Sequence, residues 1–147
     1  MTSTDQSLDV RIERHLVAPP ELAWRAWTDP AHRAVWHKDQ PDYEVEAASD
    51  LRVGGTWHVQ FGPYREEGEY LEVDPPRKVV SRVRFIAPDG TGFVTTCTAT
   101  FEPMADGGTR FVLVDAGFPD EATRDAHAGG WPQFLDRYET VLGSLSS

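Results

Sequence analysis

The spacing of apolar residues near the start of the chain predicts a strand followed by two short helices. Apolar residues stand between charged neighbours over residues 8–17, which predicts a strand. A proline pair ends that strand, and proline suits the first turn of a helix that starts at Pro20. Asp29 can then cap a second helix whose first residue is Pro30, and this helix should end near residue 36 or 37.

Between residues 42 and 115 the apolar pattern has a period of two, which predicts about six strands. Trp57, Val59 and Phe61, for example, alternate with polar residues. Turn residues separate the alternating runs, at Gly54-Gly55, Asp74-Pro75-Pro76, Pro88-Asp89-Gly90 and Asp106-Gly107-Gly108. This spacing is typical of an antiparallel meander with one dry and one solvated face. The glycine pair at the first of these turns indicates a positive φ angle rather than a phosphate-binding loop.

A helical period returns after Pro119. Asp120 is suited to cap a turn of helix that reaches about residue 128, and Gly129-Gly130 should interrupt it. The strongest helical pattern follows, with apolar residues at helical spacing, namely Trp131, Leu135, Tyr138, Leu142 and Leu145. Pro132 then serves as a first-turn proline, or marks a kink if the helix is continuous.

The order of these elements predicts a two-layer α+β domain. One sheet face and one helix stripe must bury each other, and the length suits a single domain over residues 1–147. Residues 1–7 are expected to form a frayed tail.

Charge and cysteine content exclude several classes of function. The formal net charge of −10 repels phosphate backbones and anionic lipid surfaces, so we expect neither nucleic acid nor a membrane as a partner. Cys97 is the single cysteine, and neither an apolar signal segment nor a membrane span is visible. The expected location is therefore the cytoplasm.

An ordered series of short motifs covers nearly the whole chain and resembles one known family. The chain is similar to the activator-of-heat-shock-protein-90-ATPase homologue group at its opening, in Val17-Ala18-Pro19-Pro20-Glu21, Ala26-Trp27-Thr28-Asp29-Pro30 and Trp36. The central segments also resemble that group, namely Leu51-Arg52-Val53-Gly54-Gly55-Thr56-Trp57 and Gly68-Glu69-Tyr70-Leu71-Glu72-Val73-Asp74-Pro75-Pro76. The series ends with Gly107-Gly108-Thr109-Arg110, Gly117-Phe118-Pro119 and Gly130-Trp131.

This resemblance implies the START-like, or SRPBCC, helix-grip fold. In that superfamily a curved antiparallel sheet wraps around a long C-terminal helix and leaves a cavity, and members bind lipids, hormones or polyketides. We therefore expect this protein to bind a small hydrophobic or amphipathic molecule in an internal cavity. The expected lining is a set of aromatic residues, namely Tyr43, Trp57, Phe61, Tyr70, Phe85, Phe93, Trp131 and Tyr138. Ordinary core packing is the alternative for each of them.

Titratable residues give only scattered candidates. His37 follows a tryptophan near the expected mouth of the cavity and could act as an acid or base. Glu67, Glu69 and Asp115 could point inward from strands, where burial would raise the pKa of a carboxyl group. Cys97 is expected to be a buried and unreactive thiol. No histidine or cysteine grouping suggests a metal, so we expect no metal and no cofactor, and no residue is assigned as catalytic.

Two other functions remain open beside ligand binding. One is an enzyme of the polyketide cyclase or hydrolase type that uses the same cavity, and a desolvated acid–base pair facing inward would favour it. The other is a chaperone accessory or interaction protein, which a large exposed apolar patch would favour. A homodimer is also left open.

Overall fold

A computed structural model describes residues 8–145 of the chain. The predicted tail at residues 1–7 lies outside the described residues. Strand β1 (Asp9–Leu16) is followed by helices α1 (Pro20–Thr28) and α2 (Pro30–Trp36), as the sequence predicts. The side chain of Asp29 caps α2 by accepting a hydrogen bond of 2.9 Å from the backbone N–H of Ala31.

The remaining strands form the predicted meander. They are β2 (Val45–Ser49), β3 (Thr56–Phe61), β4 (Tyr64–Asp74), β5 (Lys78–Ile86), β6 (Gly92–Pro103) and β7 (Thr109–Ala116). The sheet has seven strands in the order β1-β7-β6-β5-β4-β3-β2, and every neighbouring pair is antiparallel. The first strand therefore pairs with the last one, while β2 lies at the opposite edge.

The expected turns join these strands, and Gly54 shows why glycine is needed there. Its φ angle is +82°, in the left-handed region that glycine enters without steric cost. The neighbouring Gly55 has no room for a Cβ atom, which would overlap the carbonyl oxygen of Asp50. The prediction of a positive φ angle in this turn is confirmed for Gly54.

Helix α3 (Glu121–Leu145) is continuous, so the predicted interruption at Gly129-Gly130 is wrong. Each glycine costs a helix about 1 kcal/mol and an internal proline about 3 kcal/mol, and tertiary packing outweighs both. Arg14 of β1 holds the segment after Pro132, because its guanidinium donates to Asp136 at 2.8 Å and to Glu139 at 2.7 Å. Local helix signals could not reveal this contact, which spans the length of the chain.

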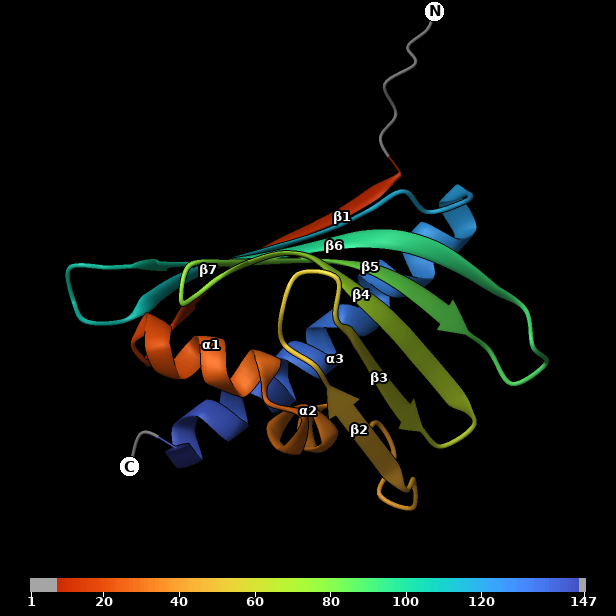
Figure 1. Ribbon diagram of the computed structural model, residues 1–147, viewed down its shortest axis with the longest axis horizontal. Coiled ribbons are helices and arrows are strands. Elements are labelled where there is room, and N and C mark those ends of the chain that lie inside the picture. The colour runs from red at the N-terminus through yellow and green to blue at the C-terminus, as the bar shows by residue number, and fades with distance from the viewer. Residues whose placement is uncertain (1–7, 146–147) are drawn as a thin grey trace, which may run out of the picture.

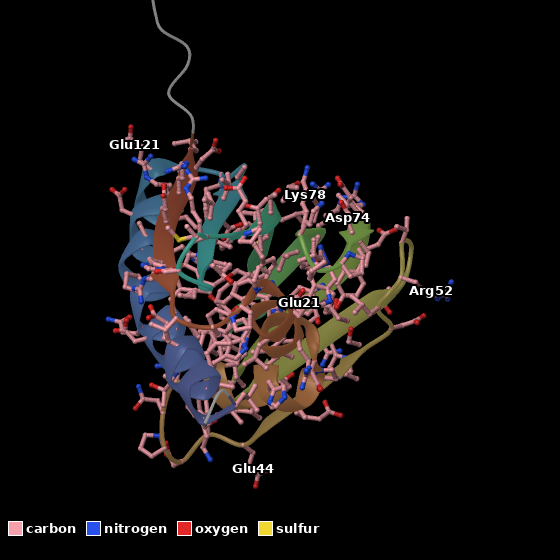
Figure 2. The ribbon with its side chains drawn as sticks, turned by 90° about the vertical axis from the view of Figure 1, so that its left-hand side faces the viewer. Glu21, Glu44, Arg52, Asp74, Lys78 and Glu121 are labelled. Atoms are coloured by element: carbon pink, nitrogen blue, oxygen red, sulfur yellow. The ribbon has the colours of Figure 1, made fainter. Side chains whose placement is uncertain are left out.

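All three helices lie on one side of the curved sheet, and α3 passes beneath it as the superfamily resemblance implies (Figure 1). Leu135, Tyr138 and Leu142 of α3 are fully buried in the same core cluster as Val59 and Phe61. The stripe does not face the sheet alone, since α3 also packs against α1 and α2. Charged side chains such as Glu44, Arg52 and Glu121 point away from the body of the protein (Figure 2). Within residues 8–145 no helix is both long and apolar enough to cross a lipid bilayer.

The buried stripe of α3 generates a stability prediction. Replacing Leu142 with alanine should lower the free energy of unfolding by about 2–5 kcal/mol, since it leaves a cavity at a fully buried site. Denaturant unfolding of the wild type and the variant measures this loss. Thr140→Ala, on the exposed face of the same helix, should change the free energy by less than about 0.5 kcal/mol. Equal midpoints for Leu142→Ala and the wild type would contradict the packing described.

Candidate functional site

A cavity of about 270 Å³ opens between α3, the segment that links α2 to β2, and strands β3 to β5. This outer chamber is lined by His37, Asp39, Gln40, Tyr43, Phe61, Tyr64, Glu66, Phe85, Ala126, His127, Gly130, Trp131 and Phe134. Its wall is mainly aromatic. The ring of Tyr43 rests on Gly62, where any side chain would overlap the phenol, so the turn between β3 and β4 places this ring at the wall.

A smaller inner chamber of about 30 Å³ lies next to the outer one. The two share Glu66, Phe85, His127 and Trp131 as common walls. The inner chamber has room for a group about the size of one or two water molecules. It is also lined by Trp27, Arg33, Trp57, Val79, Ser81, Val83, Phe93, Thr95, Cys97 and Asp115. The inner wall thus combines aromatic rings with charged and hydroxyl side chains.

Six of the eight aromatic residues predicted from the sequence lie at these chambers. Those at the outer chamber are Tyr43, Phe61, Phe85 and Trp131, and those at the inner chamber are Trp57, Phe85, Phe93 and Trp131. The indole of Trp57 lies flat against Gly68 of β4, where a side chain would overlap the ring. Its Nε1–H donates to Ser81 Oγ at 3.1 Å, which fixes the ring at the chamber wall. Whether these residues contact a ligand remains a prediction.

Tyr70 and Tyr138 line neither chamber, and the expectation that they do so is corrected. The hydroxyl of Tyr70 lies 2.7 Å from Ser49 Oγ, and the hydroxyl of Tyr138 donates to the carbonyl of Ala23 at 2.7 Å. Both rings are buried in the core. Their hydroxyl groups are therefore engaged in holding β2 and α1, and they are not available to orient a ligand.

His37 and Glu66 form an acid–base pair at the wall of the outer chamber. His37 Nε2 lies 3.0 Å from Glu66 Oε1, and His37 Nδ1 lies 3.3 Å from the carbonyl oxygen of Arg33. A neutral imidazole carries one proton, which it donates either from Nε2 to the Glu66 carboxylate or from Nδ1 to the Arg33 carbonyl. The pair can thus take up or release a proton beside the chamber.

Burial sets the proton affinities of this pair. It lowers the pKa of the His37 ring, whose side chain is 3% exposed, although Glu66 acts in the opposite direction. Burial alone would raise the pKa of Glu66, but the neighbouring His37 and Arg33 outweigh it and hold that pKa below its usual value. Desolvated groups of this kind are typical of functional sites.

Sequence reasoning chose the wrong carboxylates on β4. Glu67 and Glu69 are exposed and form ion pairs with Arg65 and Arg82 on the solvated face, so the expectation that they point inward is wrong. Glu66 is the residue that points inward. Gly68 and Tyr70 face the core, and Glu66 shares their phase in the alternation, so the period of two could have identified it.

Asp115 points inward from β7, as the sequence suggested. Its side chain accepts a hydrogen bond of 3.1 Å from Trp131 Nε1 through Oδ2, while Oδ1 is buried without a hydrogen-bond partner. Burial raises the pKa of this carboxyl group from 3.8 to about 6. Asp115 is 5% exposed, so ionisation places a poorly compensated charge beside the inner chamber.

Arg33 is a site residue that sequence reasoning missed. Its guanidinium carbon lies 4.5 Å from the ring centroid of Trp57, 4.8 Å from that of Trp36 and 5.3 Å from that of Trp27. Helical spacing could have revealed it, because Arg33, Trp36 and His37 occupy positions i, i+3 and i+4 on one face of α2. A charged residue on a short helix would otherwise be expected to face solvent.

Cys97 also borders the inner chamber, and burial raises the pKa of its thiol, which keeps it protonated and unreactive. Within residues 8–145 no three His, Cys, Asp or Glu side chains gather in the way that a metal ion requires.

The raised pKa of Asp115 predicts how stability depends on pH. The folded protein holds the proton more tightly than the unfolded chain, so this group favours folding below about pH 4 and loses that contribution as pH rises through about 6. The shift corresponds to roughly 3 kcal/mol. Urea unfolding of wild type and Asp115→Asn should show the variant gaining stability relative to wild type between about pH 4 and pH 7. A difference that does not change with pH would contradict the shifted pKa.

Comparisons with known proteins agree with this fold. A protein from Chromobacterium violaceum is 28% identical, with a TM-score of 0.78 over 91% of this chain and 96% of its own. A protein from Mycobacterium smegmatis is 24% identical, with a TM-score of 0.76 over 95% and 91%. A protein in the dynemicin biosynthetic locus is 23% identical, with a TM-score of 0.75 over 92% of this chain and 47% of its own.

No match was found among curated proteins. The family model described as "Activator of Hsp90 ATPase homolog 1-like protein" matches residues 17–143, which include both chambers and all three helices up to residue 143. The chain therefore belongs to the family of activator of Hsp90 ATPase homolog 1-like proteins.

Proposed function

We propose that the protein binds a small amphipathic molecule with a flat apolar body in the outer chamber. The observation that carries this proposal is an open cavity of about 270 Å³ with an aromatic wall, which lies next to a smaller chamber lined by Arg33 and Asp115. Ligand pockets combine a largely apolar wall with a few convergent polar groups, and they are commonly about 300–1,000 Å³ in volume. The outer chamber lies just below that range, which suits a small molecule of about two fused rings.

The walls of the cavity are held in place without a ligand. Phe134 of α3 packs against Phe61 of β3 at 6.1 Å and against His37 at 5.4 Å between ring centroids. Phe85 of β5 and the half-buried ring of His127 meet edge to face at 5.0 Å on the other side. Preformed walls reduce the entropy that is lost on binding. The negative net charge of the protein favours neutral ligands over anions.

Thermal unfolding with a panel of neutral bicyclic aromatic compounds tests this proposal. A compound that binds only the folded state should stabilise it by about 2.7 kcal/mol at roughly a hundredfold excess over Kd. Phe134→Ala should weaken the shift because it removes part of the outer wall. Leu71→Ala, at an exposed position on β4, should leave the shift unchanged. A panel of aromatic, steroid-like and acyl compounds that gives no shift would contradict ligand binding in this cavity.

The acid–base pair supports a second candidate, an enzyme that moves a proton on the bound molecule. His37 and Glu66 line the outer chamber and are desolvated, which is the feature expected to favour an enzyme over a binding protein. Such a pair could remove a proton from a carbon atom next to a carbonyl group and return it to the same carbon. The exposed large apolar side chains among residues 8–145, on which an interaction module would depend, come from several elements.

Exchange of hydrogen for deuterium tests the enzymatic candidate. In heavy water, a bound ketone should exchange the hydrogens next to its carbonyl faster with wild type than without protein. Glu66→Gln keeps the shape of the side chain but removes the base, and should slow the exchange roughly a hundredfold or more. Glu67→Gln, on the solvated face of the same strand, is the matched control. NMR spectra that show the same exchange rate with both variants would argue for binding alone.

A further inference from the structure

Arg33 carries a buried charge that has no carboxylate partner in contact. The residue is 8% exposed, and its one hydrogen bond within the described residues runs from Nε to the carbonyl of Trp27 at 3.2 Å. Within residues 8–145 no carboxylate oxygen lies within ion-pair distance of its guanidinium, although Arg14, Arg110 and Arg137 all have such partners. An arginine side chain has five N–H donors, and Nε accounts for one of them.

The three surrounding indoles stabilise the charge but do not satisfy these donors. An aromatic face attracts a cation electrostatically, and the interaction is stronger when water is excluded. It supplies no oxygen or nitrogen acceptor for the N–H groups on the two Nη atoms. Burial lowers the pKa of the guanidinium, yet the group stays protonated at neutral pH. Buried N–H donors without an acceptor lower stability, and the described residues give the two Nη groups no acceptor at the chamber wall.

The inner chamber limits what that partner can be. Its volume of about 30 Å³ admits a group no larger than one or two water molecules, which excludes a phosphate or a ring. Two carboxyl groups, Glu66 and Asp115, line the same chamber, so an anionic ligand group would be repelled by both of them when they are ionised. The chemistry that remains is a small, neutral hydrogen-bond acceptor attached to a larger body in the outer chamber.

We propose that Arg33 donates hydrogen bonds to the carbonyl oxygen of a neutral aromatic ketone, whose ring system occupies the outer chamber. The inference rests on the proposed ligand-binding function and names the chemical class of the ligand. Glu66, Phe85, His127 and Trp131 line both chambers, which makes the chambers neighbours, and the proposal requires that one molecule extend from the outer chamber into the inner one. A carbonyl oxygen has two lone pairs and can accept from both Nη groups without bringing a charge into the chamber.

Two probes of the same shape test the assignment. Acetylnaphthalene carries the carbonyl oxygen, and isopropylnaphthalene has a methyl group in its place. Quenching of tryptophan fluorescence, or calorimetry, gives Kd for each probe with each variant. The quantity compared is the Kd of isopropylnaphthalene divided by the Kd of acetylnaphthalene. This ratio should be roughly ten- to a hundredfold larger in wild type than in Arg33→Met, because hydrogen bonds to charged groups are strong. Arg33→Lys keeps the charge but loses the fork of donors, and should give an intermediate ratio.

Arg137→Met is the matched control. Arg137 also lies over an aromatic ring, that of Phe134 at 4.6 Å, and donates to the carbonyl of Trp36 at 3.0 Å, but it borders neither chamber. This variant should keep the wild-type ratio.

Infrared spectra give a readout that loss of packing would not mimic. The carbonyl stretch of the bound ketone should move to lower frequency in wild type and Arg137→Met, and should stay near its free value in Arg33→Met.

Each other outcome overturns the assignment in a distinct way. If both naphthalenes bind and the ratio is the same in wild type, Arg33→Met and Arg33→Lys, the guanidinium keeps water as its partner and the ligand-binding function still stands. If naphthoate binds more tightly than the ketone and depends on Arg33, the site takes an anion. If none of these probes binds to the wild type, both the assignment and the proposed binding of bicyclic aromatic molecules fail.

Discussion

Trp27 is the residue on which the arrangement of the helices and the sheet depends. Its indole stacks on Trp36 of α2 with centroids 4.7 Å apart, and it meets Tyr138 of α3 and Phe111 of β7 at 5.3 Å each. One buried ring on α1 thus contacts two helices and the sheet. Aromatic pairs contribute about 0.5–1.5 kcal/mol each beyond the area that they bury. Trp36 Nε1 and Tyr138 Oη donate hydrogen bonds to backbone carbonyls of α1, and these bonds fix the orientation of both rings against Trp27.

This aromatic layer also explains why a cavity remains. α1, α2 and α3 lie on one side of the sheet (Figure 1), and an open cavity remains between α3 and strands β3, β4 and β5. Polar groups collect there at a cost in stability. The pair of His37 and Glu66, the half-satisfied carboxyl of Asp115 and the charge of Arg33 all lose hydration on folding. The tightly packed layer offsets that cost, which allows the cavity to keep groups that a purely structural core would exclude.

Residues of the candidate site could be predicted from the sequence only where the alternation of apolar and polar residues along a strand showed which side chains point inward. Alternation along β3 placed Trp57 and Phe61 on the inner face, and both lie at the chambers. The same alternation pointed to Glu66 through Gly68 and Tyr70, but abundant acidic neighbours masked the signal. Arg33 was harder to find, since an arginine on an exposed-looking helix is ordinarily solvated. Its burial depends on tryptophans of α1 and β3 that only the fold brings together.

The sequence by itself determined the kind and order of the elements, the positions of the turns and the α+β class. Period, proline and glycine signals act between residues a few positions apart, so they can be seen in one dimension. The tertiary structure decided the continuity of α3, because Arg14 and the buried stripe outweigh the pair Gly129-Gly130 and Pro132. It also decided that Tyr70 and Tyr138 lie in the core while Tyr43 lines the outer chamber, and it decided which other residues meet at the chambers. Those outcomes depend on contacts between residues far apart in the chain, whose energies no local pattern contains.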